Sequence, residues 1–431
     1  MKIRTILATG LAASVALALT ACTGGGAPQG GGSADGEITG EITFQTWSLK
    51  NDKFTPYFED VVAAFEKEHE GVKVNWIDQP AEGYEDKILQ QAESGELPDV
   101  VNLPPEFAHE LAGVGQLIDV KKESDIIDQY VEGGLEAYTF DGIEGTYAFP
   151  WYLGTELNYW NMALLEKGGI TEAPKTVDEM LDAASALAKV GERTISGVPG
   201  PKTLQVLLTD QGAEYPFIVD GEFSFDTPEA VALVERYAEL YKEGAVSPEA
   251  LQNAGVANDN IDNFNKGTVA WTTAGPNYID KNLAVNAPTL LPSVTVTSGF
   301  GNQPLFVQGI SVSANSKNPA AALAFAEFVT DDENQIAFMK LAAGFFPGTV
   351  KANEDPSAFA EAAQNEQQKA ATDFAAQQMA TARVPGAPGS GYVDSMEGYA
   401  KQQIALAITG EISAKEALQK AQDYANENAS E

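Results

Sequence analysis

The sequence predicts an α/β fold in which mainly parallel sheets are flanked by helices. Residues 41–47 alternate polar and apolar side chains, as a half-buried strand does, and residues 72–76 repeat this pattern. Between them, residues 54–68 carry apolar side chains at helical spacing. Residues 84–93 form a second helical pattern, and residues 99–103 form a short apolar strand. A β-α-β-α-β order of this kind builds a parallel sheet with helices on both faces.

Helix start signals predict the elements of the later chain. Two capping boxes satisfy the free backbone N–H groups of a first turn, and two prolines stand where a first helical residue is expected. The Ala- and Gln-rich residues 359–382 are also predicted to be helical. The start signals are Thr176 with Glu179, Pro228, Pro319, and Ser413 with Glu416.

Composition excludes several classes of function. The 431 residues carry 62 acidic and 26 basic side chains, for a formal net charge of −36. Phosphate recognition needs clustered Lys and Arg, so nucleic acid is not an expected partner. The histidines are His69 and His109 and there is one cysteine, so the ordinary zinc and iron ligand sets and an internal disulfide cannot be assembled. We expect no metal and no cofactor, and the length fits two large lobes.

The first residues have the pattern of a secretory signal. Lys2 and Arg4 precede an uncharged apolar run over residues 6–19, which is too short to span a membrane. The run ends in Leu-Thr-Ala-Cys, which resembles the lipobox of bacterial lipoproteins. This predicts a signal peptide at residues 1–21, lipid attachment to Cys22 and a flexible Gly/Ser-rich tether over residues 22–36. The mature protein would be anchored by lipid to the outer face of the bacterial cytoplasmic membrane.

Seven motifs, in order along the chain, resemble those of extracellular solute-binding proteins of carbohydrate-uptake ABC transporters (maltose-binding-protein-like, family 1). Each motif is weak alone, and together they cover nearly the whole mature chain. They include a Gly-x-x-Pro-Asp-Val turn, a Pro-Lys-Thr-x-x-Glu helix start and a Gly-Pro turn after an apolar strand. The motifs lie at residues 42–47, 94–101, 149–161, 173–179, 264–276, 310–318 and 407–418.

The resemblance implies a two-lobed, periplasmic-binding-protein-like fold with the ligand cleft between the lobes. An N-terminal lobe of residues 37–150 and 271–313 would face a C-terminal lobe of residues 151–270 and 314–431. The crossings would fall near Trp151, Trp271 and Val312. The lobes would close on a sugar by hinge motion and deliver it to the permease subunits of an ABC transporter. The protein would be a monomer and not an enzyme.

The chemistry of a pyranose indicates which residues would hold it. Aromatic rings suit its C–H faces, and forked polar groups suit its hydroxyl rim. The loops after Thr46, Ile77 and Leu103 lie beyond the carboxyl ends of predicted strands, where ligands bind in such sheets. An interior position is the alternative for Trp47 and Trp151, and a solvated loop position is the alternative for each polar residue. The predicted ligand-binding residues are Trp47, Asn51, Asp52, Gln79, Tyr84, Glu106, Trp151, Tyr152, Asn277, Tyr278, Phe300, Asn302 and Phe346.

One position departs from the family pattern. The Gly-Pro turn is often followed by a tryptophan that stacks on sugar, whereas here Asn277 and then Tyr278 follow it. Either Tyr278 does the stacking or the pocket has another shape. Phe345 is a further candidate for the cleft, and we interpret Trp76 and Trp271 as core residues.

Two other classes of function remain as alternatives. A glycoside hydrolase needs two carboxylates about 5–9 Å apart, and 62 acidic residues supply such pairs by chance. The chain contains no Gly-x-Ser-x-Gly elbow, no Gly-Lys dipeptide and no His-Glu-x-x-His motif, so common catalytic signatures are missing. A solute-binding protein for a polyamine or a peptide is the second alternative, because composition alone does not separate it from a sugar-binding protein.

Overall fold

The computed structural model describes residues 36–252, 254, 259–360, 365–387 and 390–429. The predicted signal peptide, the lipidation residue Cys22 and the tether, apart from Gly36, lie outside these residues. In the described part of the chain, no helix is long and apolar enough to cross a membrane. The described residues gather into two hydrophobic cores. A six-stranded sheet lies in the first core, and a three-stranded sheet contributes side chains to both.

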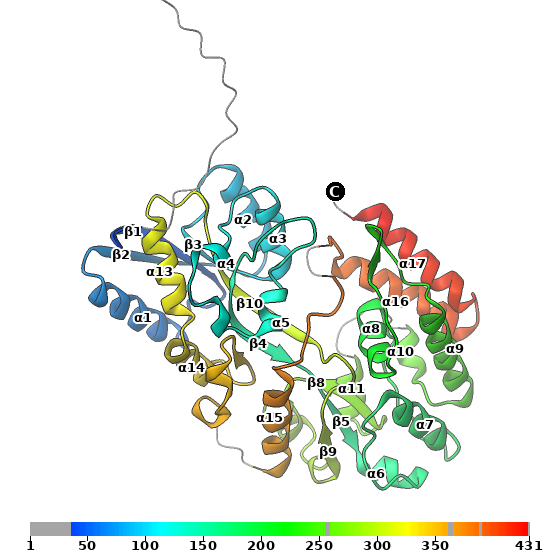
Figure 1. Ribbon diagram of the computed structural model, residues 1–431. Coiled ribbons are helices and arrows are strands. Elements are labelled where there is room, and N and C mark those ends of the chain that lie inside the picture. The colour runs from blue at the N-terminus through cyan, green and yellow to red at the C-terminus, as the bar shows by residue number, and fades with distance from the viewer. Residues whose placement is uncertain (1–35, 253, 255–258, 361–364, 388–389, 430–431) are drawn as a thin grey trace, which may run out of the picture. The chain divides into compact units, whose positions relative to one another are not determined.

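The first core surrounds a six-stranded sheet of described residues, in the order β11-β4-β10-β3-β1-β2 (Figure 1). β1 pairs in parallel with β2 and β3, which confirms the predicted parallel arrangement of the first three strands. β10 runs antiparallel to both β3 and β4, because it enters the sheet from the side of the second core, so the complete sheet is mixed. The strands are β1 (Gly40–Trp47), β2 (Val72–Gln79), β3 (Val100–Leu103), β4 (Phe149–Thr155), β10 (Leu305–Val312) and β11 (Phe346–Pro347).

Helices cover both faces of this sheet. The Phe44 ring of β1 contacts Phe58 of α1 and Phe325 of α13, with ring centroids 6.1 and 5.2 Å away. The next residue, Gln45, exchanges hydrogen bonds with Gln91 of α2. Successive strand residues point to opposite faces, so α1 and α13 lie on one face and α2 on the other. The helices and short turns of this part are α1 (Thr55–Glu68), α2 (Tyr84–Glu93), α3 (Pro105–Gly113), α4 (Val120–Glu123), η1 (Ile127–Gln129), α5 (Glu132–Glu136), α13 (Pro319–Val329), α14 (Asp332–Leu341), η5 (Lys351–Asn353) and η6 (Pro356–Ala358).

The second core is mainly helical and lies against the three-stranded antiparallel sheet β8-β5-β9. Both helices begin at the predicted caps, since Thr176 accepts a hydrogen bond from the backbone N–H of Glu179, and Ser413 accepts one from the N–H of Glu416. The Glu179 carboxylate accepts from the Lys175 N–H and not from that of Thr176, so the first capping box forms in its N-cap half. The elements of this part and of the junction are β5 (Leu157–Asn161), α6 (Met162–Leu165), η2 (Glu166–Gly168), α7 (Val177–Ala188), α8 (Pro201–Asp210), β6 (Ile218–Val219), β7 (Glu222–Phe223), α9 (Pro228–Glu243), α10 (Pro248–Gln252), α11 (Asp259–Asn265), β8 (Trp271–Ala274), η3 (Ile279–Leu283), α12 (Ala284–Asn286), η4 (Leu291–Ser293), β9 (Val294–Thr297), α15 (Glu366–Gln378), α16 (Asp394–Thr409) and α17 (Ala414–Asn428).

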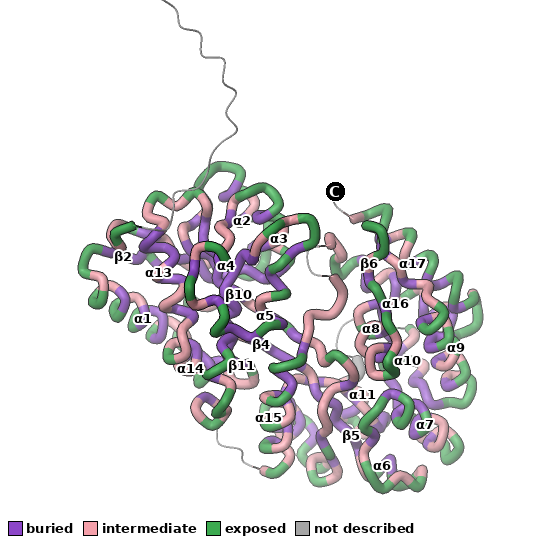
Figure 2. The backbone as a smooth tube through the Cα atoms, in the orientation of Figure 1, coloured by how far each residue is buried: buried purple, intermediate pink, exposed green. Residues whose placement is uncertain are grey.

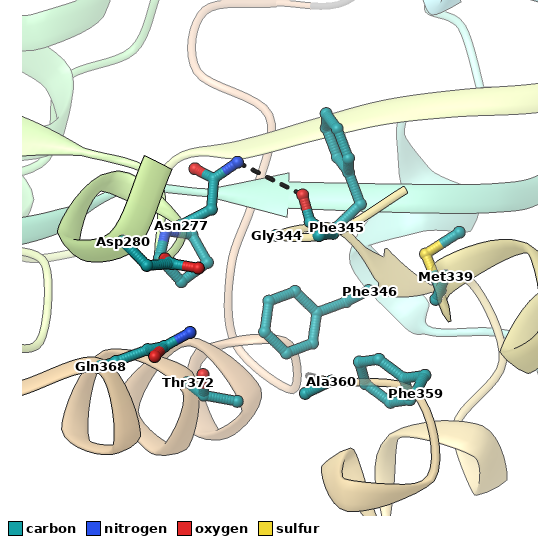
Figure 3. A pocket seen from close by; sticks show the side chains of 12 residues that line it. Asn277, Asp280, Met339, Gly344, Phe345, Phe346, Phe359, Ala360, Gln368 and Thr372 are labelled. Atoms are coloured by element: carbon teal, nitrogen blue, oxygen red, sulfur yellow. Dashed lines mark hydrogen bonds between the residues drawn. The ribbon is translucent and has the colours of Figure 1, made fainter. Parts of the chain in front are cut away.

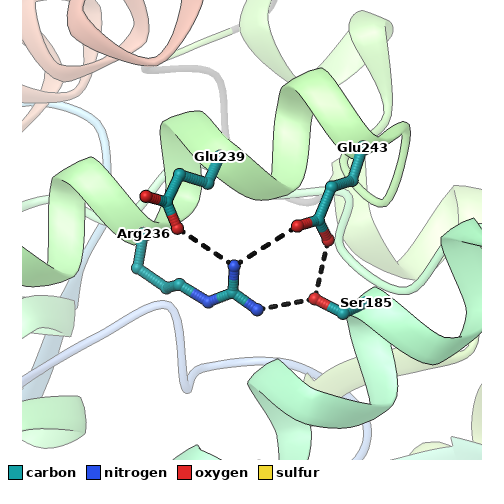
Figure 4. A network of polar contacts seen from close by, with 4 residues as sticks. All are labelled: Ser185, Arg236, Glu239 and Glu243. Atoms are coloured by element: carbon teal, nitrogen blue, oxygen red, sulfur yellow. Dashed lines mark hydrogen bonds and ion pairs between the residues drawn. The ribbon is translucent and has the colours of Figure 1, made fainter.

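A polar network at the surface joins α7 to α9 in the second core (Figure 4). The guanidinium of Arg236 lies 3.2 Å from a Glu239 carboxylate oxygen and 3.5 Å from one of Glu243. It also donates to the Ser185 hydroxyl at 2.6 Å, and that hydroxyl donates to Glu243 at 2.6 Å. The network therefore connects the two helices through one serine.

The later half of the chain divides between the two cores. Residues 314–431 were assigned to a single lobe from the sequence, but α13 and α14 pack in the first core and α16 and α17 in the second. The reason is the composition of α13, whose residues are buried on several sides and whose Phe325 ring lies 5.1 Å from Phe65. Such a helix requires a covered position against the first sheet.

Three described segments carry the chain between the two parts. The first crossing is residues 155–156, the last residue of β4 and the one that joins it to β5, and the second is residues 298–304, between β9 and β10. The third crossing is residues 379–387, which follow α15. Trp271 and Val312, which the sequence predicts near crossings, are instead the first residue of β8 and the last residue of β10. Figure 2 shows β4 and β10 as largely buried.

Candidate functional site

The carboxyl ends of β1 and β3 bring Trp47 and Tyr84 together with Asn102. The half-buried Trp47 ring stacks on Tyr84, with centroids 5.4 Å apart and planes 13° apart. The Tyr84 hydroxyl donates to the Asn102 carbonyl oxygen at 2.9 Å. Ser48, directly after Trp47, has a φ of +58°, which a residue with a side chain adopts only when its surroundings impose it. β1 therefore ends in a tight turn that holds Trp47 at the sheet edge.

Two buried polar atoms at this edge have no hydrogen-bond partner among the described residues. They are Nε1 of Trp47 and Oδ1 of Asn102. The other amide atom of Asn102, Nδ2, is satisfied because it donates to Gln308 Oε1 at 3.1 Å and to the Gly309 carbonyl at 3.2 Å. An unpaired buried polar atom costs about 1–3 kcal/mol, so such atoms mark positions where a ligand or a water supplies the missing bond.

Accessible aromatic rings gather around Gly154 on β4. Phe306, which pairs with Gly154 in the sheet, is 51 % exposed, and Phe345 is 39 % exposed. A Cβ atom at Gly154 would lie 3.4 Å from the Phe345 ring and 3.6 Å from Phe306 Cβ, so the two side chains flank the glycine. The half-buried Tyr152 ring lies edge-on to Phe345 with centroids 5.2 Å apart. These rings form an open apolar surface of the kind that suits the C–H faces of a sugar.

A buried carboxylate supports the start of α8 from the second core. Glu397 of α16 is 8 % exposed and accepts hydrogen bonds from the Tyr392 hydroxyl at 3.0 Å and the Lys202 backbone N–H at 3.4 Å. The carboxylate fits only because Gly200 has no side chain, since a Cβ there would lie 2.0 Å from Glu397 Oε1. Burial raises the pKa of Glu397, and the nearby Lys401 ammonium, 4.0 Å away, opposes the rise.

Charged groups of the two cores face each other beside this support. The pKa of Glu106 on α3 is raised by desolvation, although the side chain stays exposed, and Lys202 on α8 opposes that rise. Lys202 Nζ lies 3.9 Å from Asp394 at the start of α16. At the first crossing, burial raises the pKa of Glu156, while a hydrogen bond from Thr273 and the charge of Lys401 lower it. Lys202 thus lies near carboxylates of both cores, and Lys401 lies near the buried Glu156 and Glu397.

A cavity of about 600 Å³ is lined by residues of both cores and of the third crossing. Glu136 of α5 contributes from the first core, and Gln205 and Thr209 of α8 contribute from the second. Asn302 of the second crossing and Arg383 of the third complete the polar lining. The volume lies within the range of about 300–1,000 Å³ that small-molecule sites occupy, and the lining offers both donors and acceptors.

Asn277 closes a smaller cavity, of about 40 Å³, between η3, β11 and α15 (Figure 3). Its Nδ2 donates to the Ala343 carbonyl at 3.2 Å. Gly344 has a φ of +92°, and a Cβ there would lie 2.6 Å from the Asn277 side chain, so both the conformation and the close approach require glycine. The ring of Phe346 lines this cavity and is 2 % exposed. The position where the family often carries tryptophan is therefore held tightly by its neighbours.

Four predicted aromatic residues lie in the cores and not on an open face. Trp151 is 0 % exposed and stacks on Phe338, 4.5 Å away. Tyr278 donates its hydroxyl to Asn265 at 2.6 Å, so it is not the replacement stacking residue that the sequence suggested. Phe300 is 3 % exposed in the second core, and Phe346 is buried as described above. An aromatic ring next to a strand is stabilised by burial in the core. The pattern of a single sequence does not distinguish such a buried ring from one that is exposed for stacking on a ligand. Trp76 is a core residue, as predicted.

The predicted polar residues stay at loop surfaces. Asn51 and Asp52 are exposed, and Asn51 caps its own loop by accepting from the backbone N–H groups of Lys53 and Phe54. Gln79 is half-buried at the end of β2, and its carbonyl accepts from the Ser48 N–H at 2.8 Å. Asn302 is exposed and lines the larger cavity.

Several residues of the site were missed from the sequence. Phe306 occupies the outward position of an alternating strand, Leu-Phe-Val, and this alternation could have identified it. Asn102 is a polar residue within an apolar strand, which is a similar signal. Glu397, Lys202 and Arg383 carry no local signal, because only the fold brings them to partners that are distant in sequence.

Comparison with known proteins places these features in a family. The model of the bacterial extracellular solute-binding protein family matches residues 60–370. The galactooligosaccharide-binding protein of Bacillus subtilis is 25 % identical over 345 residues, which cover 75 % of this chain and 76 % of that protein. The diacetylchitobiose-binding protein DasA of Streptomyces coelicolor is 27 % identical over 45 % of this chain and 44 % of its own.

Solved structures share the fold at low sequence identity. The cyclic α-maltosyl-1,6-maltose binding protein of Arthrobacter globiformis superposes with a TM-score of 0.71 at 18 % identity, covering 90 % of this chain and 98 % of that one. The sugar-binding protein MalE of Xanthomonas citri superposes with a TM-score of 0.70 at 20 % identity, covering 90 % and 97 %. The chain has the two-lobed solute-binding-protein fold.

The chain belongs to the bacterial extracellular solute-binding protein family. Within the part that the structure describes, no group of three or more His, Cys, Asp or Glu side chains is placed to hold a metal ion.

Proposed function

We propose that the protein captures a sugar, an oligosaccharide, by closure of its two lobes and delivers it to the permease of an ABC transporter. The cavity of about 600 Å³, lined by both cores, carries this proposal. A ligand held there touches both lobes at once, so its binding energy favours the closed arrangement. The polar lining of this cavity suits the hydroxyl rim of a pyranose. The open rings of Phe306 and Phe345, which lie outside that lining, offer a surface for its C–H faces.

The names of related proteins support the ligand class. The Bacillus subtilis relative is a galactooligosaccharide-binding protein, and the Streptomyces coelicolor relative binds diacetylchitobiose. Both are binding proteins, which supports a role in transport without catalysis. We propose ten residues as ligand contacts. Trp47, Tyr84, Glu106, Tyr152 and Asn302 are contacts that the sequence also predicts, and Asn102, Phe306, Gln308, Phe345 and Arg383 are added by the structure.

A thermal shift panel tests the ligand class. The chain from residue 36 onward is melted with mono- and oligosaccharides, short peptides, polyamines and divalent metals. A compound that binds only the folded protein at a hundred times its dissociation constant adds about 2.7 kcal/mol of stability, which a melting curve resolves. We expect a shift from one class of oligosaccharide and no turnover of it. A shift from spermidine or from peptides alone would replace the sugar by the second candidate solute.

We also propose that lipid on Cys22 anchors the protein outside the cell. The support is the sequence of the first residues, with a cationic start, an apolar run and the sole cysteine at its end. Cys22→Ser is expected to move the protein from the membrane fraction to the soluble fraction. Equal membrane association of the two forms would contradict the anchor.

A further inference from the structure

The three crossings meet at one side chain, the amide of Gln378 at the end of α15. Gln378 is 3 % exposed. Its Nε2 donates to the Thr155 hydroxyl at 2.9 Å and to the Glu156 carbonyl at 3.1 Å, both in the first crossing. Its Oε1 accepts from the Ser298 hydroxyl at 2.7 Å and from the Gly299 backbone N–H at 2.6 Å, both in the second crossing.

This amide has no spare hydrogen-bonding capacity. A glutamine side chain has two donor hydrogens and two acceptor lone pairs, and all four are used here. Its orientation follows from its neighbours, because the Glu156 carbonyl can only accept and the Gly299 N–H can only donate. A rotation that separated either crossing from Gln378 would leave buried groups unpaired, which is costly.

The crossings are also joined to one another around this amide. The Thr155 hydroxyl donates to the Pro304 carbonyl at 2.8 Å, which links the first crossing to the second. Arg383 N–H donates to the Gln303 carbonyl at 3.1 Å, and the Arg383 carbonyl accepts from Leu305 N–H at 2.9 Å. These bonds link the second crossing to the third. The junction therefore behaves as one unit of three segments.

The third crossing contacts the first core through Arg383 and the second core through Gly386. Arg383 lies 2.6 Å from Glu136 and 3.0 Å from Glu132, both on α5 of the first core. The approach is close, since a Cβ at Gly133 would lie 2.3 Å from the Ala382 carbonyl oxygen. Three residues later, the Gly386 N–H donates to Gln205 of α8 in the second core at 2.7 Å.

We propose that Gln378 is the pivot on which the two cores turn, a positioning residue for capture of the solute. It holds the three crossings in fixed relation while the cores move on either side, and so restricts closure to one rotation. This inference rests on the proposed capture of the solute by closure of the lobes. It also predicts that Gln378 limits the relative orientation of the two cores when no ligand is bound. Loss of the amide is expected to leave both cores folded and to let their relative orientation vary.

Distance measurement between two spin labels tests the pivot. Labels are placed at Val114→Cys in the first core and Val219→Cys in the second, which are 69 % and 45 % exposed, in the full chain carrying Cys22→Ser. Without any sugar, we expect one narrow distance distribution in the parent and a distribution at least twofold wider in Gln378→Met. The matched control is Gln368→Met, a buried glutamine earlier on α15, which is expected to keep the parent's width.

The outcomes separate this inference from the proposed function. A Gln378→Met distribution as narrow as the parent's, or equal widening by Gln368→Met, would overturn the pivot. If Gln378→Met does not fold, Thr155→Val and Ser298→Ala each remove part of the junction, and unchanged widths in both would overturn it equally. The parent is also measured with maltotriose and with a galacto-oligosaccharide mixture. Absence of shortening there speaks against the sugar, while the comparison of widths without sugar still decides the pivot.

Discussion

Two regions of the molecule differ in how their buried polar atoms are paired. The first core has a neutral side at the carboxyl ends of β1 and β3, with the stacked rings of Trp47 and Tyr84 and the amide of Asn102, where Trp47 Nε1 and Asn102 Oδ1 have no partner among the described residues. The second core presents charged groups, and its buried Glu397 is paired with a hydroxyl, an N–H and an ammonium group. An unpaired atom such as Trp47 Nε1 gains a hydrogen bond from a ligand, whereas a carboxylate that is already paired, such as Glu397, mainly supports shape. Substitutions in each region test whether binding energy comes from the unpaired atoms of the first core.

The largest effect is expected at Trp47. Trp47→Ala removes a half-buried ring that stacks on Tyr84, so we expect the affinity for the sugar found in the panel to fall about tenfold or more, on the scale of a buried aromatic side chain. Titration calorimetry measures it. Unchanged affinity would show that Trp47 does not contact the sugar. The neutral side of the first core would then not be the main source of binding energy.

Trp47→Phe sharpens the same comparison. It keeps an aromatic ring but removes Nε1–H, which has no hydrogen-bond partner in the protein. We expect a loss of affinity about as large as one hydrogen bond, a few-fold to tenfold, with no hydrogen bond lost inside the protein. Trp160→Phe is the control, because the Trp160 Nε1 donates to Thr297 at 3.0 Å in the second core. The control is expected to lower the melting temperature and to leave affinity unchanged.

A smaller effect is expected at Gly154. The substitution Gly154→Ala adds a methyl group 3.4 Å from the Phe345 ring, at a backbone conformation that alanine tolerates. We expect affinity to fall severalfold because the methyl group occupies the space between the two rings and covers part of their surface, with little change in stability, since the contacts are ordinary van der Waals contacts and the alanine also restricts the unfolded chain. Melting curves and calorimetry on one sample separate the two quantities. A large loss of stability with affinity preserved would show that the rings serve packing and not binding.

Most of the early fold could be predicted from local patterns. The alternation in β1 and β2 and the helical spacing of α1 survive in the structure because each element buries one face against its neighbours in sequence. The assignment of α13 and α14 could not be made in the same way. These helices return to the first sheet after a long excursion of the chain, and their sequence says that they are buried but not against which sheet.

The site was predictable in part for the same reason. Trp47 and Tyr84 sit at the ends of elements whose order the sequence shows, so their proximity followed from topology. Trp151 and Tyr278 have the same apparent signal, an aromatic residue near a strand end, but the structure buries them. Glu397 and Gly200 lie far apart in sequence, and a buried carboxylate that fits against a glycine cannot be deduced from either residue alone.

The buried Glu397 of the second core is expected to make the free energy of unfolding depend on pH. Burial raises the pKa of Glu397 above its ordinary value of 4.5. A carboxyl with a raised folded-state pKa stabilises the fold below its unfolded pKa, and that contribution is lost as pH rises through the folded-state pKa. Relative to Glu397→Gln, the parent should therefore lose unfolding free energy as pH rises from about 4 to 8. Denaturant unfolding of both proteins at each pH measures the difference. If the difference in unfolding free energy between the parent and Glu397→Gln did not vary with pH, burial would not raise the pKa of Glu397.

The smallest effect is expected at a charged network that lies outside the site. Ser185→Ala removes the hydroxyl that joins Arg236 to Glu243 (Figure 4). These charges are partly exposed to water, so the expected loss of unfolding free energy is below about 1 kcal/mol and becomes smaller in high salt. Affinity for the sugar should be unchanged, because the serine and its partners contact neither side of the space between the cores. Paired charges occur both in this network and around Glu397. Comparing Ser185→Ala with Glu397→Gln therefore shows whether an effect comes from the loss of a charge pair itself or from the place of that pair in the protein. If Ser185→Ala weakened binding as Trp47→Phe does, binding would depend on the rigidity of the second core and not on the unpaired atoms of the first.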